Sequence, residues 1–174
     1  MIFHKTPFEG LMCIEFEPRS DERGYFMRIF SRDEFAREGI EFQIAQVNCS
    51  ATVKRGTLRG LHFQKSPHEE TKIVSCLRGK IFDVAVDLRK ESSTYRQWMG
   101  LELSPEKNAA FFIPKGFAHG FQTLMDDCEV EYLISEFYHP ESAYGARWND
   151  PILHITWPIT DPLLSEKDQN WPFL

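Results

Sequence analysis

Hydrophobic and polar residues alternate with a period of two through most of the middle of the chain. The clearest run is Lys80–Leu88, in which four apolar side chains share one face while Asp83 and Asp87 lie on the other. Alternate residues of a strand point to opposite faces, so this run predicts a half-buried strand. The sequence predicts ten strands in all, because nine further runs behave similarly: Met12–Phe16, Gly24–Phe30, Phe42–Asn48, Leu58–Gln64, Thr71–Leu77, Trp98–Leu103, Ala109–Ile113, Phe117–Leu124 and Glu129–Phe137.

Turn-forming residues separate these strands. Arg78–Lys80, with a central glycine, is typical of a tight hairpin. One helix is predicted over Arg32–Glu38, because Ser31 and Glu34 form a capping-box pattern and a glycine follows as a stop. From Tyr138 onward the composition predicts loops and short turns. Short strands with frequent turns predict an all-β sandwich or barrel with one or two short helices.

Length and composition fit an ordinary globular protein. With 174 residues, we expect a single domain over residues 1–174. Hydrophobic residues make up 42% and charged residues 26%, the balance of a soluble protein. No run approaches the roughly 18 apolar residues of a membrane span, and the first residues lack the apolar core of a signal peptide. We therefore expect a cytoplasmic protein with no membrane partner.

Charge and cysteine usage exclude further classes of function. The net charge of −6 disfavours non-specific binding of nucleic acid, so an anionic ligand would need a local cationic site. The four cysteines are dispersed without a CxxC pair, which supports neither a structural zinc site nor a disulfide framework.

Several chemically active side chains fall on inward faces of predicted strands. In Leu58–Gln64, alternation places His62 on the face of Gly60 and points Arg59 the other way. His119 and Tyr132 share their faces with apolar residues in two later strands. A lone inward histidine is commonly a hydrogen-bonded core residue. Two histidines with a tyrosine and a glycine that leaves space for a ligand favour a binding site instead.

Two kinds of chemistry would suit such a site. A metal centre usually draws two histidines from one strand at HxH spacing with a nearby carboxylate, and His62 and His119 lie far apart without one. Acid–base chemistry needs a neutral histidine as base and a tyrosine as acid, and Lys72 could stabilise an enolate oxygen. These groups match proton abstraction next to a ketone. Asp168 is a candidate to orient the histidine, although spacing alone does not select it.

Six motifs follow one another over nearly the whole chain: Asp21–Phe26, Leu58–Gln64, Phe82–Arg89, Ile113–Phe121, Arg147–Pro151 and Leu164–Asp168. In order and spacing, they resemble the dTDP-4-dehydrorhamnose 3,5-epimerase family. The resemblance implies a cupin-type jelly roll (a double-sheet β-barrel) and a homodimer that shares strands across its interface. It also implies a nucleotide-linked 4-keto-6-deoxyhexose as substrate, inverted at carbons 3 and 5 without a metal or organic cofactor.

The resemblance assigns roles residue by residue. His62 matches the general base, Asp168 its dyad partner, Lys72 the group that stabilises the enolate, and Tyr132 the acid on the opposite face. Four residues match contacts to the diphosphate and sugar: Arg23, Arg59, His119 and Lys167. Four more match positions near the nucleotide: Phe26, Gln46, Asn48 and Tyr138, the last as a stacking platform for the base.

Departures from the family pattern fall mainly in the expected nucleotide pocket. Arg28 and Ala143 stand where glutamates are common, and Val47 replaces an aspartate. Recognition of a base rests on a few directional hydrogen bonds, so another nucleotide (CDP, GDP or UDP) stays open. Three further hypotheses stay open beside it: inversion at carbon 3 alone, a metal-dependent cupin enzyme, and a non-catalytic sugar-nucleotide binding module.

Overall fold

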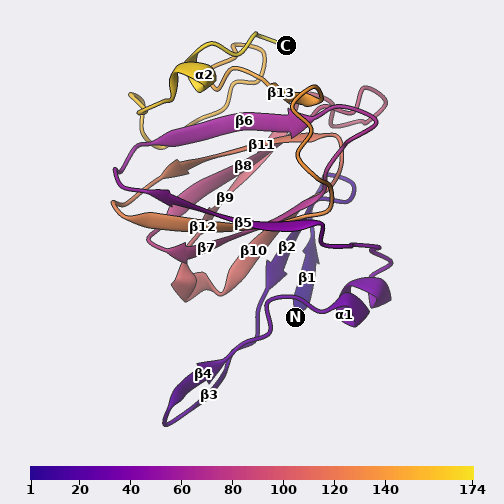
Figure 1. The fold of residues 1–174 in the computed structure, drawn as a ribbon, viewed down its shortest axis with the longest axis vertical. Helices are drawn as coiled ribbons and strands as arrows, with labels where there is room; N and C mark the ends of the chain where they lie inside the picture. The colour runs from indigo at the N-terminus through magenta and orange to yellow at the C-terminus, as the bar shows by residue number, and fades with distance from the viewer.

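The structure is a computed structural model that describes residues 1–174, and it consists mainly of two antiparallel sheets. The elements are β1 (Ile2–Lys5), β2 (Met12–Glu15), β3 (Arg19–Asp21), β4 (Gly24–Phe26), α1 (Arg32–Arg37), β5 (Gln46–Thr52), β6 (Leu58–Gln64), β7 (Lys72–Arg78), β8 (Ile81–Asp87), β9 (Trp98–Leu103), η1 (Pro105–Lys107), β10 (Ala109–Ile113), β11 (Phe117–Thr123), β12 (Cys128–Ile134), β13 (Ala143–Gly145) and α2 (Glu166–Gln169). One sheet has the order β1-β2-β10-β7-β12-β5 and the other β13-β6-β11-β8-β9. They pack face to face, and the β3–β4 hairpin projects away from them (Figure 1). This is the all-β jelly roll that the sequence predicts.

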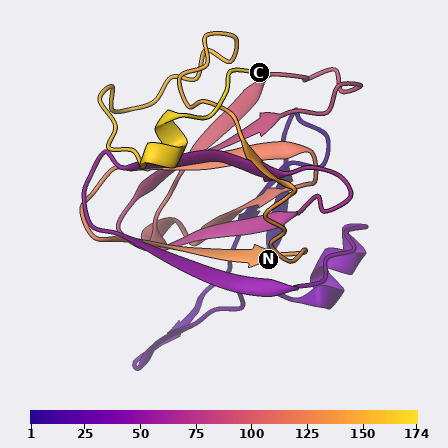
Figure 2. The same cartoon turned by 45° about the horizontal axis from the view of Figure 1, so that its top comes forward.

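Two apolar clusters position the cavity described below. Between the sheets, Phe111 of β10 and Phe121 of β11 are fully buried and belong to one cluster. On the outer face of the five-stranded sheet, Val84 packs in a second cluster with Trp157 of the C-terminal segment. Figure 2 shows this segment, in yellow, running over that sheet, with α2 beside β6. Neither helix has the length and apolar character needed to cross a membrane.

The C-terminal segment covers the outer face of the five-stranded sheet and so changes the environment of β8. Because apolar residues lie against both of its faces, the expectation of a half-buried strand with a solvent-facing side is wrong. Asp83 and Asp87 are fully buried, and both find partners inside the protein.

Strand pairing, more than hydrophobicity, decides where several strands lie. The predicted strands 58–64, 98–103 and 109–113 match β6, β9 and β10 residue for residue. The predicted strand 42–48 is displaced: β5 begins at Gln46 and ends at Thr52, because its whole length pairs with β12. The predicted strand 24–30 ends at Phe26, where the β3–β4 pairing ends. The alternation gave no indication of the short strands β1, β3 and β13.

Both helices are short, and their ends differ from the expectation. Helix α1 confirms the prediction, but Ser31 makes no side-chain cap. Glu34 instead binds the Met1 amino group and Arg28, so the capping-box interpretation is wrong. Helix α2, in a region predicted as loops and turns, is capped by the Ser165 hydroxyl, which accepts the Asp168 backbone N–H at 3.1 Å.

We expect Asp87→Asn to destabilise the fold in a pH-dependent way. Burial raises the pKa of Asp87, but hydrogen bonds from Arg89, Ser92 and Thr94 lower it more, to about 2 from 3.8. A depressed carboxyl pKa contributes stability above the unfolded value, and this contribution is lost as the pH falls through the folded value. The shift corresponds to about 2 kcal/mol at pH 7. Urea unfolding should show this loss at pH 7 and a smaller one as the pH falls from about 4 toward 2.

Asp161→Asn, at an exposed position, is the matched control and should change stability little. An equal loss for Asp87→Asn at neutral and acidic pH would contradict the role given to its ionised carboxylate.

Candidate active site

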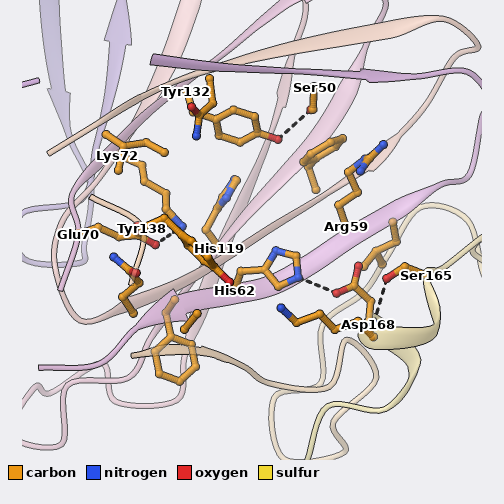
Figure 3. Close-up of a pocket in the computed structure, with 18 of the residues that line it drawn as sticks. Ser50, Arg59, His62, Glu70, Lys72, His119, Tyr132, Tyr138, Ser165 and Asp168 are labelled. Carbon is orange, nitrogen blue, oxygen red and sulfur yellow. Dashed lines mark hydrogen bonds and ion pairs between the residues drawn. The ribbon is translucent and has the colours of Figure 1, made fainter. Parts of the chain in front are cut away.

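A cavity of about 780 Å³ opens between the two sheets and is bordered by the C-terminal segment. Figure 3 shows charged and aromatic side chains from both sheets turned toward it. Ten of the twelve site residues predicted from the sequence line this cavity: Gln46, Asn48, Arg59, His62, Lys72, His119, Tyr132, Tyr138, Lys167 and Asp168. The other two, Arg23 and Phe26, do not line it.

His62 and Asp168 form a hydrogen-bonded dyad across a long sequence separation. The His62 Nε2 and Asp168 Oδ1 atoms are 2.6 Å apart, and Trp171 Nε1–H donates to the same oxygen at 3.2 Å. Burial raises the pKa of the Asp168 carboxyl, but its hydrogen bonds, chiefly with His62, lower it more, so its pKa lies below the ordinary value. The carboxylate is therefore ionised at neutral pH and can hold the imidazole in one orientation.

A shift of register in β6 turns two polar residues toward the cavity. His119 of β11 pairs with His62, and Phe121, two residues on, pairs with Arg59, three residues back. β6 thus carries one extra residue, as in a β-bulge. Arg59 and His62 therefore both line the cavity, and the expectation that Arg59 points away is wrong.

His119 has a carboxylate partner that the sequence pattern did not reveal. Its Nε2 lies 2.7 Å from Asp83 Oδ1, and both side chains are almost fully buried. The expectation that neither histidine has a close carboxylate is therefore wrong for both. The sequence signal for this partner was the pair Asp83 and Asp87 on one face of β8. Alternation alone predicts that this face is exposed to solvent.

The opposite wall carries a tyrosine and a lysine from the six-stranded sheet. The Tyr132 hydroxyl lies 3.1 Å from Ser50 Oγ. Burial is the main reason that its pKa is raised, so the phenol keeps its proton at neutral pH. Lys72 is buried and forms an ion pair with Glu70 at 2.7 Å. Because His62 and Tyr132 come from different sheets, they face the cavity from opposite sides (Figure 3).

Cationic and amide groups surround the rest of the cavity. The Arg59 guanidinium donates to Thr52 Oγ1 at 3.0 Å, which fixes it at the wall. Lys167 lies over the Trp171 ring at 5.1 Å. Gln46 accepts the Tyr138 backbone N–H at 3.1 Å and so ties that loop to β5. Arg59 and Lys167 form no ion pair with a carboxylate, so these two cations of the cavity wall can bind an anionic ligand in an otherwise acidic protein.

The two predicted residues outside the cavity lie on the projecting β3–β4 hairpin. The Arg23 side chain is 85% exposed and pairs with Asp21, and Phe26 is 70% exposed.

The three residues that depart from the family pattern lie in different parts of the structure. Ala143 lines the cavity, whereas Val47 is exposed and Arg28 pairs with Glu34. Only one of the three substitutions therefore changes the cavity wall of this chain.

Comparisons with known proteins agree on one family. Residues 5–174 match the family model described as dTDP-4-dehydrorhamnose 3,5-epimerase. The protein of that name from Methanothermobacter thermautotrophicus is 51% identical over 172 residues, covering 97% of this chain and 92% of that protein.

Two solved structures are similar over 99% of this chain. A Bacillus anthracis dTDP-4-dehydrorhamnose 3,5-epimerase with TDP and PPi bound has a TM-score of 0.97 at 40% identity, with 99% of that chain covered. A Legionella pneumophila epimerase in complex with dTDP-4-keto-L-rhamnose has a TM-score of 0.93 at 40% identity, with 92% of that chain covered. Together with the two dyads and the cationic cavity, these matches show that the chain belongs to the dTDP-4-dehydrorhamnose 3,5-epimerase family.

Proposed function

We propose that this protein is an epimerase that inverts carbons 3 and 5 of a dTDP-linked 4-keto-6-deoxyhexose without a cofactor. The observation that carries the proposal is the placement of His62 and Tyr132 on opposite walls of one cavity. Inversion at carbon requires a proton to leave from one face and another to arrive at the opposite face. A base and an acid on facing sheets supply this geometry.

The chemistry begins at a C–H bond next to the C4 ketone. Neutral His62 takes the proton, and the electron pair of the C–H bond moves into an enolate with charge on the C4 oxygen. The Lys72 ammonium, held by Glu70 at 2.7 Å, stabilises this oxygen. Tyr132 then gives its proton to carbon from the opposite face. The ionised Asp168 stabilises the imidazolium that forms at His62.

The other cavity residues suit the remainder of a nucleotide sugar. Arg59 and Lys167 would contact the diphosphate, since charged hydrogen bonds to phosphate oxygens are strong. Gln46, Asn48 and Tyr138 form the part of the wall that we assign to the base, with Tyr138 as a stacking surface. The TDP and dTDP-sugar named for the two solved relatives support dTDP as the nucleotide.

A homodimer would explain the projecting hairpin. Arg23 and Phe26 match substrate-contacting positions of the family, yet they lie outside the cavity of their own chain. We infer that the hairpin of each subunit reaches the cavity of the other. Each subunit remains a single domain, since one cavity draws its lining from Gln46 through to Trp171.

Substitution of His62 and Tyr132 should separate proton removal from inversion. We expect His62→Ala to lower both solvent exchange and inversion by about 10²- to 10⁴-fold. Tyr132→Phe should retain exchange, because His62 can return a solvent deuteron to the same face, but it should lose inversion. Proton NMR in deuterated buffer with dTDP-4-keto-6-deoxyglucose measures both at carbons 3 and 5.

His154→Ala, at an exposed histidine, is the control and should behave as wild type. Exchange at the wild-type rate in His62→Ala would refute the role of His62, and exchange at carbon 3 alone in the wild type would make the protein a 3-epimerase.

The two carboxylate–histidine pairs should differ in their effect on exchange. We expect Asp168→Asn to slow exchange by about 10²-fold or more, because a neutral amide no longer stabilises the imidazolium. Asp83→Asn should act mainly on KM, because its partner His119 is assigned to substrate contact. Steady-state kinetics at several substrate concentrations, with circular dichroism to check folding, makes the comparison. A larger loss of kcat in Asp83→Asn would identify His119 as the base instead.

Mixed dimers test whether the hairpin acts across the interface. Arg23→Ala should lower kcat/KM by roughly 10- to 100-fold, the value of a lost charged hydrogen bond, whereas Arg19→Ala on the same hairpin should not. Co-expressed Arg23→Ala and His62→Ala chains would form dimers with one intact cavity, and about a quarter of wild-type activity should return. No recovery in verified mixed dimers would contradict the exchange of hairpins.

A further inference from the structure

Two histidines and a glutamate meet outside the catalytic cavity. His68 lies in the connection between β6 and β7, and Glu136 and His139 lie in the connection between β12 and β13. One potential ligand atom from each residue lies within 4.8 Å of the other two. The two imidazole rings stack with centroids 3.4 Å apart and an interplanar angle of 12°. None of the three residues lines the cavity, although their neighbour Tyr138 does.

We propose that His68, Glu136 and His139 bind a divalent transition-metal ion of the zinc type beside the cavity entrance. Nitrogen, nitrogen and carboxylate oxygen form a donor set that zinc and its neighbours prefer, whereas magnesium and calcium prefer oxygen alone. Ligand atoms around a tetrahedral ion are about 3.4 Å apart, given bonds of about 2.1 Å. The lone pairs of the stacked rings lie in parallel planes, so one imidazole must turn out of the stack before both nitrogens reach the same ion. Both side chains are partly exposed and free to turn, and water completes the coordination.

The backbone that carries these ligands is held by one buried side chain. Gln64 is 5% exposed, and both the nitrogen and the oxygen of its side-chain amide form hydrogen bonds with the two connections. Its Nε2 donates to the carbonyl oxygens of His68 and Phe137, both at 3.0 Å, and its Oε1 accepts the His139 N–H at 2.7 Å. The two connections are thereby fixed relative to each other before any ion binds, which reduces the entropy lost on binding.

A second carboxylate orients one of the ligands. Glu141 Oε1 lies 3.3 Å from His139 Nδ1. A carboxylate accepts hydrogen bonds, so this contact assigns the ring proton to Nδ1 and leaves the lone pair on Nε2. That Nε2 atom lies 4.0 Å from Glu136 Oε1, the carboxylate of the proposed ligand set. Metal-binding histidines are commonly oriented by a carboxylate on the other ring nitrogen in this way.

This site is separate from the chemistry proposed for the cavity. In the cavity, the Nε2 atoms of His62 and His119 are each hydrogen-bonded to a separate aspartate. These two nitrogens are therefore occupied and do not offer a second pair of metal ligands. The expectation that the protein has no metal site rested on spacing along single strands. His68 and His139 are brought together by the pairing of β7 with β12, which joins the two connections in space.

Titration calorimetry of the untagged full chain, first freed of metal with a chelator, tests the proposal with zinc chloride as the probe. We expect one ion per chain. His68→Gln and His139→Gln should each weaken zinc binding by more than about 100-fold, and Glu141→Gln, which removes only the orienting group, by about 10- to 100-fold. His4→Gln and His154→Gln are matched controls that should bind zinc as the wild type does. Circular dichroism checks that each variant is folded, and Glu136→Gln serves as a further ligand variant should one histidine variant fail to fold.

Three results would overturn the proposal. The first is no zinc binding by the wild type. The second is undiminished binding in folded His68→Gln or His139→Gln, which would place the ion elsewhere. The third is equal affinity for calcium or magnesium chloride, which would contradict the nitrogen ligands. None of these results bears on proton exchange at the sugar, so the proposed epimerase activity is tested independently.

Discussion

The geometry of the cavity depends on the close approach of two backbones, at Gly60 of β6 and Gly120 of β11. A Cβ atom added to Gly60 would lie 2.5 Å from the Gly120 Cα, and Gly60 has φ +147°, which side chains rarely tolerate. This approach lies inside the register shift that places both Arg59 and His62 on the cavity side. Larger residues at the two glycines would separate the strands. The placement of His62 and Arg59 on the cavity side of one strand therefore requires the absence of two side chains.

The two cavity histidines each pair with an aspartate, but they differ in how deeply they are buried. Asp83 is fully buried on β8 and holds His119 inside the sandwich. Asp168 comes from the C-terminal segment and holds His62, whose side chain is 42% exposed toward the cavity. The more exposed imidazole can meet a ligand and exchange its proton with solvent, whereas the more buried one is restricted to orientation and hydrogen bonding. The same segment that covers the outer face of the sheet also completes the dyad.

Local pattern was sufficient for much of the fold, and its failures have a common cause. The bounds of strands 58–64, 98–103 and 109–113 follow from the local pattern, although the register shift in β6 overturns the face that alternation gives Arg59. The bounds of β5 and the burial of Asp83 and Asp87 depend on what packs against them from distant parts of the chain. Alternation reports that two faces differ, but it does not report which face is covered.

The same distinction between local pattern and long-range packing applies to the candidate site. The family resemblance predicted twelve site residues, of which ten line the cavity, because motif order carries information about contacts that spacing lacks. The proximity of His62 and Asp168 depends on the C-terminal segment folding back over β6, and that of His68 and His139 depends on β7 pairing with β12. Both arrangements set a carboxylate against a histidine nitrogen, yet one lies in the cavity and the other beside its entrance. Surroundings, more than residue type, thus distinguish the proposed proton-transfer pair from the proposed metal ligands in this protein.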